Sequence, residues 1–140
     1  MTHHHFRLPS TISESATLAA RVRAICVLKG GAASTADAIE LCAIEGFNNA
    51  VEHAHDSDPT RVVEVTVEFL DGVVNVAIQD TGRSMPPGKL EAAEMPIPDP
   101  KDPTTWSDRG RGLAIIKTLM DSVTYESSHG KNTLRFRKRL

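Results

Sequence analysis

The fold is decided by the stretch from residue 41 to residue 53, Leu41-Cys42-Ala43-Ile44-Glu45-Gly46-Phe47-Asn48-Asn49-Ala50-Val51-Glu52-His53. Wound as a helix, this stretch and its flanks place apolar residues on one side: Ile39, Ala43, Phe47, Ala50, Val51 and Ala54. The opposite side gathers the polar residues Glu45, Asn48, Asn49 and Glu52, because residues three, four and seven apart share a helix face. The pattern predicts a helix with one buried face.

The polar face of this helix has an unusual content. It carries two amides beside two carboxylates and no Lys or Arg, although cations usually accompany acids on a merely solvated face. Carboxylate and amide oxygens suit a hard divalent ion such as Mg²⁺. A carboxylate one turn away from such an ion can accept a proton from a hydroxyl nucleophile. A solvated face that happens to lack Lys is the alternative, and the helix alone does not exclude it.

Length and composition indicate one soluble domain over residues 1–140. The chain has 40% hydrophobic and 24% charged residues and a net charge of −2, and only 4% of its residues are aromatic. This balance argues against nucleic acid as a partner, and no apolar run is long enough to span a membrane. Cys26 and Cys42 fall in predicted helices and suit small buried thiols of a reducing cytosol. We therefore expect a cytoplasmic protein.

The N-terminal part predicts a short strand followed by two helices. Residues 2–8 form the strand, and its three histidines, residues 3–5, suit a solvated edge strand better than a metal site or part of an expression tag. Ser13 is the expected N-cap of the first helix, which Gly30 and Gly31 end. Ser34 with Asp37 resembles a capping box that opens the helix containing residues 41–53.

The rest of the chain predicts two hairpins separated by a long loop and a helix. Apolar residues alternate with polar ones from residue 61 to Asp80, interrupted by the turn pair Asp71-Gly72. A helix over residues 110–120 follows the loop, and the last two strands are expected at 123–127 and 131–138, with Leu134 and Phe136 facing inward. The loop holds six of the eight prolines, which excludes a long helix or an interior strand, and we interpret residues 83–109 as a mobile lid.

Besides the polar helix face, two features of this order carry chemistry. Asp80 ends a strand, where its carboxylate can accept a hydrogen bond from an exocyclic amine such as that of adenine, and Gly82 leaves room for a flat ligand. Gly110 and Gly112 open a helix whose exposed amides suit phosphate, and Arg109 and Arg111 add positive charge there. Taken singly, an Asp before a turn is usually turn chemistry and a Gly-x-Gly before a helix is often plain packing. The combination predicts a nucleotide site.

The order of these motifs resembles the Bergerat ATP-binding fold, which histidine-kinase catalytic domains and gyrase-type ATPases share. Residues 45–53 are similar to the N box of that superfamily, Asp80-Thr81-Gly82 to its first glycine box, and Gly110-Arg111-Gly112-Leu113 to its second. The resemblance covers nearly the whole chain and implies an α+β fold, a two-layer sandwich in which helices back a mixed, mostly antiparallel sheet. Within the superfamily, the chain is most similar to bacterial anti-sigma-factor serine kinases, a likeness that extends to residues 119–123.

The resemblance also implies a function and roles for residues. The protein would bind a sigma factor and use Mg-ATP to phosphorylate a serine of a small antagonist with a sulfate-transporter-and-anti-sigma (STAS) domain, as a homodimer paired through its first strand and first helix. Glu45 would be the general base, Asn49 the Mg²⁺ ligand and Asp80 the adenine contact. The remaining nucleotide contacts would come from Gly82, Arg109, Gly110, Arg111, Gly112, Leu113 and Thr133, the last of them helping to hold adenine.

One position departs from the family pattern. The first glycine box normally has a second glycine where this chain has Ser84. If that position needs a positive φ, the serine destabilises the turn by roughly 1 kcal/mol and weakens nucleotide binding. Ser84 therefore favours a rival interpretation, a non-catalytic module that keeps the fold and sequesters a partner, while Glu45 and Asn49 favour the kinase. A detached histidine-kinase catalytic domain ranks third, because no phosphoacceptor helix pair is present.

Overall fold

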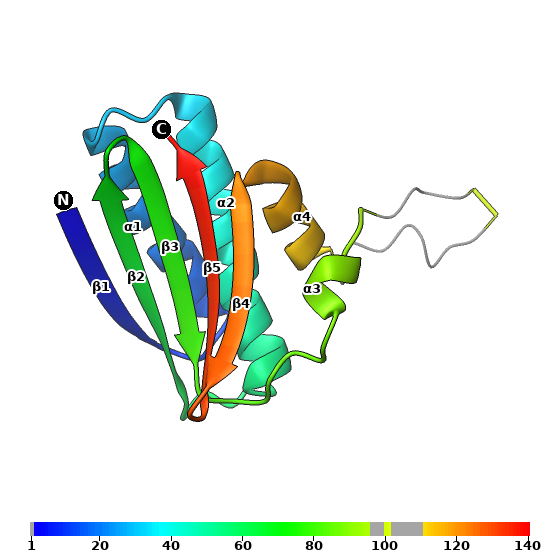
Figure 1. Cartoon of the computed structure of the whole chain (residues 1–140). Coiled ribbons are helices and arrows are strands. Elements are labelled where there is room, and N and C mark those ends of the chain that lie inside the picture. Colours follow the sequence, from blue (N-terminus) through cyan, green and yellow to red (C-terminus); the bar gives the residue numbers. More distant parts are fainter. Residues whose placement is uncertain (1, 96–99, 102–110) are drawn as a thin grey trace.

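A computed structural model describes residues 2–95, 100–101 and 111–140 of the chain. Its centre is a five-stranded sheet in the order β1-β2-β3-β5-β4 (Figure 1). The strands are β1 (Thr2–Pro9), β2 (Val62–Leu70), β3 (Val73–Asp80), β4 (Ser122–Ser128) and β5 (Lys131–Arg139). Every pair of neighbours is antiparallel, so the mixed sheet that we expected is, in the described residues, wholly antiparallel.

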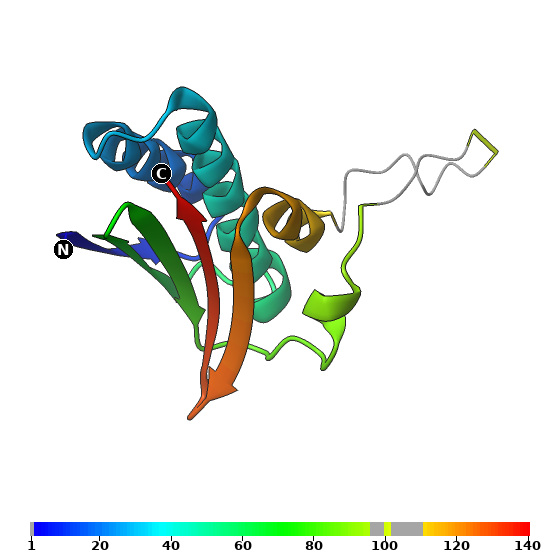
Figure 2. The ribbon, with the colours of Figure 1, turned by 45° about the horizontal axis from the view of Figure 1, so that its top comes forward.

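The helices form the second layer. They are α1 (Ser13–Leu28), α2 (Ala33–Asn49), the π-helix η1 (Ala50–Ala54), α3 (Lys89–Ala92) and α4 (Gly112–Leu119). Figures 1 and 2 show α1, α2 and α4 against one face of the sheet, while the other face is open. The predicted α+β two-layer architecture is confirmed.

The core lies between these layers and follows the predicted periodicities. All six apolar residues assigned to the inner side of the central helix are at most 9% exposed, and Phe47 is fully buried. Burial alternates along β2 and β3, with Val63, Val65 and Val67 inside, as expected for strands with one buried face. The Asp71-Gly72 turn has positive φ at both residues, which is the requirement of a type I′ hairpin turn.

The two cysteines are buried free thiols, as predicted. Burial, and to a smaller extent the carboxylate of Glu45, raises the pKa of Cys42 to about 12. Such a thiol is not reactive near neutral pH. Cys42 is therefore a packing residue of α2.

The predicted helix starts are wrong in detail. Helix α1 begins at Ser13 itself, and the preceding residue makes no side-chain cap. Helix α2 begins at Ala33, and Ser34 and Asp37 do not form a capping box. Asp37 instead pairs with Arg23 of α1, a contact between helices that local sequence spacing does not reveal.

The long helix changes its winding where it approaches the end of β3. After Asn49 it continues as the π-helix η1, and the amide of His55 donates to the carbonyl of Ala50 at 3.0 Å. A π turn is wider than an α turn and often marks a functional site. Here it lies directly beside the Asp80 end of the sheet, where Arg83 N donates to Ala54 O at 2.9 Å.

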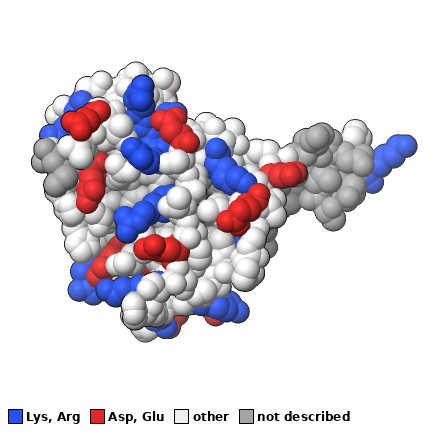
Figure 3. Space-filling view, viewed as in Figure 1, with Lys and Arg blue, Asp and Glu red and all other residues white. Residues whose placement is uncertain are grey.

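The open face of the sheet is polar. β1 is an edge strand, as expected, and its histidines alternate: His3 Nδ1 lies 3.3 Å from Glu68 Oε1 and His5 Nε2 lies 3.8 Å from Glu64 Oε2 on β2. Figure 3 shows positive and negative side chains interspersed over this face. None of the helices among residues 2–95, 100–101 and 111–140 is long and apolar enough to cross a membrane.

Candidate functional site

A cavity of about 230 Å³ lies where β3 ends, between η1 and the first part of the predicted lid. Three elements line it, together with the lid residues. They contribute Asn49, His53 and Ala54 from the central helix, Asp80 from β3, Tyr125 from β4, and Arg83, Ser84, Met85, Pro86 and Lys89 from the chain after β3. The cavity therefore brings together two of the predicted site residues, Asn49 and Asp80, which are 31 positions apart.

Asp80 is fixed in this cavity through one of its two carboxylate oxygens. Its side chain is buried, and Oδ1 accepts hydrogen bonds from Gly82 N at 3.0 Å and from Asn132 Nδ2 at 2.7 Å. The described residues supply no hydrogen bond to Oδ2. That oxygen is thus the one available to a ligand, and as a carboxylate oxygen it accepts a donor such as an exocyclic amine.

Gly82 is required by close packing. A Cβ at this position would lie 2.1 Å from Ala54 O and 2.7 Å from His55 Cδ2, so no larger residue fits. Sequence reasoning assigned the glycine to a flat ligand. The structure shows that the turn after β3 needs it to press against the backbone at the end of η1.

A buried side-chain pair, Ser10 and His55, packs against the turn after β3. Ser10 Oγ and His55 Nδ1 are 2.9 Å apart, and both residues are at most 4% exposed. The amide of Thr81 donates to His55 Nε2 at 3.4 Å. Burial lowers the pKa of His55, against a smaller opposite effect of the Asp80 charge.

The strain predicted for Ser84 is absent. Ser84 is not among the described residues with positive φ, so the turn does not need a glycine there. Its hydroxyl instead lies 2.8 Å from Ser127 Oγ and 2.9 Å from Asn132 Oδ1. The serine makes two contacts that a glycine cannot make.

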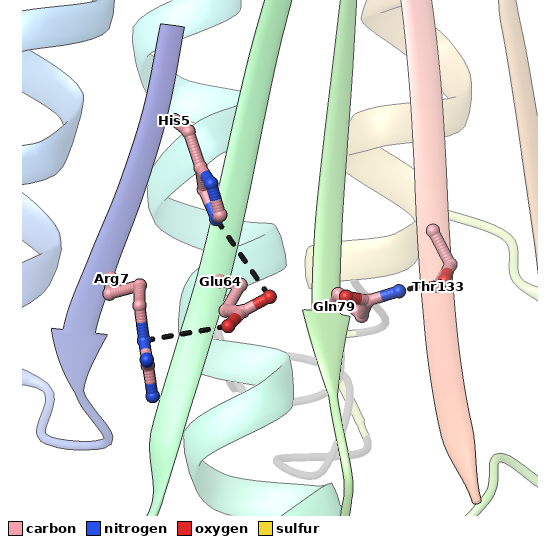
Figure 4. Close-up of polar contacts among 5 residues, drawn as sticks. All are labelled: His5, Arg7, Glu64, Gln79 and Thr133. Atoms are coloured by element: carbon pink, nitrogen blue, oxygen red, sulfur yellow. Dashed lines mark hydrogen bonds and ion pairs between the residues drawn. The ribbon is translucent and has the colours of Figure 1, made fainter.

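The structure does not bring Thr133 to Asp80. β5 pairs with β3 so that Asn132 is opposite Asp80 and Thr133 is opposite Gln79. Figure 4 shows Gln79 and Thr133 on the open face of the sheet, where Gln79 Nε2 donates to Thr133 Oγ1 at 3.4 Å. Asn132 occupies the place beside Asp80. The alternation that puts Leu134 and Phe136 inward also puts residue 132 inward, so the sequence contained the signal.

Glu45 lies against the start of α4. A Cβ at Gly112 would be 2.8 Å from Glu45 Oε2, which places the carboxylate beside the first residue of this helix. Burial, and second the carboxylate of Glu52, raises the pKa of Glu45 above its ordinary value. A carboxylate with a raised pKa is a better proton acceptor when ionised, as general-base catalysis requires.

The other nucleotide contacts predicted around the start of α4 divide into three groups. Leu113 is 5% exposed and its side chain packs in the core, so only its backbone can face a ligand. Arg111 is half-buried and precedes α4 directly. Arg109 and Gly110 lie outside the described residues, as does much of the predicted lid.

Sequence reasoning missed several cavity residues. His53 lies one turn after Asn49 on the same helix, so its spacing was a usable signal. Tyr125 and Lys89 had no such signal, because nothing local connects β4 or α3 to Asp80. The hydroxyl of Tyr125 accepts from Met85 N at 2.8 Å and thereby fixes the chain as it leaves the cavity.

Comparison with known proteins agrees with this geometry. Residues 8–138 match the family described as the histidine kinase-like ATPase domain. The chain belongs to this family. It is also 32% identical over 101 residues to the anti-sigma F factor of Geobacillus stearothermophilus, and 26% identical over 104 residues to that of Clostridium botulinum. The alignments cover 72% of this chain in both cases and 66% and 68% of the relatives, so the chain spans about two thirds of the length of the curated relatives it matches.

Solved structures show the same fold. A Mycobacterium tuberculosis structure with RsbU and RsbW domains superposes with a TM-score of 0.70 at 22% identity, covering all of this chain and 33% of that one. The Pseudomonas aeruginosa SiaB–SiaC complex gives a TM-score of 0.62 at 15% identity, covering 98% of this chain and 89% of that one. Both confirm that this histidine kinase-like ATPase domain has the architecture described above.

Proposed function

We propose that this protein is an ATP-dependent protein serine kinase that also acts as an anti-sigma factor in a partner-switching system. The observation that carries the proposal is the position of Glu45. Its carboxylate lies at the first residue of α4, one helical turn from Asn49, which lines the same cavity as Asp80. Asp80 would bind adenine, and the start of α4 would bind phosphate.

The transfer step needs few protein groups. A serine Oγ of the substrate protein attacks the γ-phosphorus, and the bond between that phosphorus and the oxygen bridging to the β-phosphate breaks. Adenosine diphosphate leaves with the bond's electron pair, and the serine proton moves to a Glu45 carboxylate oxygen. Gly112, which has no side chain, lets this carboxylate approach the helix start where the phosphates would lie.

The donor set fits a magnesium ion. Asn49 lines the cavity with an amide oxygen, Glu45 offers a carboxylate one turn away, and the neighbouring Asn48 Oδ1 is buried without a hydrogen-bond partner among the described residues. Amide and carboxylate oxygens are the ligands that Mg²⁺ prefers. Asn49 would hold the ion, and the bound ion would neutralise charge on the transferred phosphate.

The relatives support the choice of partners. The similar Geobacillus and Clostridium proteins are named anti-sigma F factors. By this likeness we assign a sigma factor as the bound target and a STAS-domain antagonist as the phosphorylated protein, both in the cytoplasm. A homodimer paired through β1 and α1 belongs to the same proposal, because the free edge of β1 presents unpaired backbone groups that a second copy would cover.

The rival interpretation, a non-catalytic sequestering module, loses its main support. It rested on strain at Ser84, and that residue is unstrained and hydrogen-bonded. The kinase proposal is also supported by Asn49, which lines the cavity, and by Glu45 at the start of α4, because a module without turnover needs neither residue.

The test combines capture with phosphate transfer. The immobilised chain is exposed to extract of its source cells with and without Mg-ATP, and the captured sigma factor and antagonist are identified by mass spectrometry. The purified antagonist is then incubated with γ-labelled ATP and either wild type, Glu45→Gln or the matched control Glu40→Gln. We expect Glu45→Gln to lower phosphate incorporation by about 10² or more while both partners still bind, the usual contribution of a general base.

Each result has a distinct meaning. Normal transfer by Glu45→Gln would remove Glu45 from the base role. A wild-type chain that binds both partners and ATP but transfers no phosphate would support the sequestering module. Sedimentation of a clean monomer at tens of micromolar chain would contradict the homodimer.

A further inference from the structure

A hydrogen-bond chain leads to Asp80 at the edge of the cavity, and the family pattern assigns none of its other members to the nucleotide. It runs from Ser127 on β4 through Ser84 and Asn132 to Asp80, with O···O or N···O distances of 2.8, 2.9 and 2.7 Å. Asn132 is 2% exposed and Asp80 is 8% exposed. Two stretches far apart in the sequence, residues 80–84 and 127–132, therefore meet at the Asp80 carboxylate.

The direction of the chain follows from the chemistry of its groups. Asp80 Oδ1 and Gly82 O accept only, so the side chain of Asn132 must turn its amide nitrogen toward both, at 2.7 and 3.0 Å. Both amide hydrogens are then used. The amide oxygen of Asn132 is left facing Ser84, whose hydroxyl donates to it, and the Ser127 hydroxyl donates to Ser84 in turn.

This arrangement divides the two oxygens of Asp80 between two tasks. Oδ1 receives two protein donors, Gly82 N and Asn132 Nδ2, so the carboxylate cannot rotate without losing both hydrogen bonds. Oδ2 remains as an acceptor in the cavity. A purine with an amine at position 6 can donate a hydrogen bond to Oδ2. A purine with a carbonyl at position 6 would instead place its carbonyl oxygen, an acceptor, against the acceptor Oδ2.

We propose that Asn132, oriented by Ser84, is the positioning residue that makes the site selective for a 6-amino purine over a 6-oxo purine. This inference rests on the proposed ATP function, and specifically on adenine binding at Asp80. Asn132 acts through Asp80 and does not itself contact the base, because both of its amide hydrogens are already used. Ser84 stands where the family usually has glycine, and its hydroxyl donates to the amide oxygen of Asn132. The two residues therefore act together.

The experiment measures base selectivity. Affinities of adenosine diphosphate and inosine diphosphate are determined calorimetrically for the full chain and its variants, so that no turnover interferes. Wild type should prefer the adenine ligand by at least about tenfold, since a buried acceptor left without its donor costs about 1.4 kcal/mol or more. Asn132→Leu, similar in shape but without polar atoms, should reduce that preference about tenfold.

A second variant separates positioning from simple structural support. Ser84 is exposed and lies at the outer part of the hydrogen-bond chain. Ser84→Ala should reduce the preference for adenosine diphosphate about threefold, in keeping with the loss of one neutral hydrogen bond. Because Ser84 acts only through Asn132, adding Ser84→Ala to Asn132→Leu should produce no further change. Asn75→Leu, the same substitution on the open face of β3, is the matched control and should leave the preference unchanged.

The outcomes distinguish the two proposals. If Asn132→Leu and Ser84→Ala weaken both ligands equally and keep the wild-type preference, Asn132 is a structural tie and the inference is wrong. If wild type binds both diphosphates equally, the inference is wrong although nucleotide binding stands. If wild type binds neither, the proposed ATP function fails and the inference falls with it. Should Asn132→Leu not fold, Ser84→Ala alone decides.

Discussion

The proposed base site around Asp80, called the base end below, and the proposed phosphate site around Glu45 and Asn49, called the phosphate end, are built in different ways. At the base end, Asp80, Gly82, Ser84 and Asn132 satisfy one another through hydrogen bonds of 2.7 to 3.0 Å. At the phosphate end, no hydrogen bond to a described residue holds Glu45 or Asn49, and Asn48 Oδ1 is buried without such a partner. Among the described residues, the protein itself completes the base end, whereas Glu45, Asn48 and Asn49 at the phosphate end keep side-chain oxygens without a hydrogen bond.

This difference has an energetic meaning. A buried polar atom without a partner destabilises the fold by about 1–3 kcal/mol, and a ligand that pairs with it recovers that free energy on binding. Polar groups held in place before the ligand arrives do not need to reorganise during the reaction. The base end therefore suits recognition of one shape, and the phosphate end suits groups that arrive with the nucleotide.

The first and largest effect is expected from Gly82→Ala at the base end. The new Cβ would lie 2.1 Å from Ala54 O and 2.5 Å from its carbonyl carbon, which are backbone atoms that cannot turn aside. Overpacking of this kind costs about 1–3 kcal/mol of folding free energy. Because the displaced turn carries Asp80, binding of adenosine diphosphate should also be lost. Urea unfolding and calorimetric titration measure the two effects, and unchanged stability would contradict the packing described here.

Gly112→Ala at the phosphate end should separate stability from activity. Its Cβ would lie 2.8 Å from Glu45 Oε2, the far end of a flexible side chain that can move. Alanine is a better helix residue than glycine by up to about 1 kcal/mol, so folding stability should stay equal or rise. Displacement of the base should lower phosphate transfer at least about tenfold.

The same substitution thus gives opposite results at the two glycines. Urea unfolding and transfer of labelled phosphate, each measured on both variants, make the comparison. If Gly112→Ala destabilised the chain as strongly as Gly82→Ala, the contrast between a rigid and an adjustable end would be wrong.

Sequence reasoning predicted the parts of the molecule that local periodicity controls. The buried side of α2 and the alternation of β2 and β3 followed from spacing alone, because one face of each element must avoid water. Helix starts were predicted less well. Asp37 bonds to Arg23 of another helix rather than capping its own, and such a partner is set by tertiary packing.

The site shows the same division. Glu45, Asn49 and Asp80 could be predicted as site residues because a single helix face and a strand end carry them, and the structure places Asn49 and Asp80 in one cavity. Their roles stay predictions. Asn132 and Tyr125 depend on how β4 and β5 pair with β3, which sequence spacing within one element does not specify. Ser84 was interpreted as a handicap because its partners, Ser127 and Asn132, lie more than 40 positions away.

The third prediction concerns His55, which accepts from the amide of Thr81 next to Asp80. The pKa of His55 is lower in the folded protein than its ordinary value of 6.5, chiefly through burial, so the unfolded chain binds more protons between the two values. Stability is then full above about pH 6.5 and decreases as the pH falls below it. Urea unfolding between pH 7 and pH 5 should show this decline, and His55→Gln should flatten it. The control His3→Gln, on an exposed ring, should retain the wild-type slope, and an equally steep slope in His55→Gln would exclude His55 as the cause.

The smallest effect on stability is expected at α3, within the predicted lid. Lys117, in the last turn of α4, donates from Nζ to the carbonyls of Leu90, Glu91 and Ala93 at 2.9, 2.9 and 3.1 Å, and so ties α3 to the end of α4. Lys117→Met keeps the length of the side chain and removes the donors. Amide exchange in α3 should accelerate severalfold, while the free energy of unfolding should fall by only about 1 kcal/mol, since a four-residue helix adds little to the core.

Lys138→Met is the matched control, because its ammonium donates to a single helix-end carbonyl, that of Leu119, at 2.8 Å. It should leave exchange in α3 unchanged. If both variants accelerated exchange equally, the effect would come from general loosening of α4. If only Lys117→Met did so while the preference for adenosine over inosine diphosphate stayed at its wild-type value, the base end would be independent of the lid. That independence is expected, because among the described residues the hydrogen bonds that orient Asp80 come from Gly82 and β5 and none comes from α3.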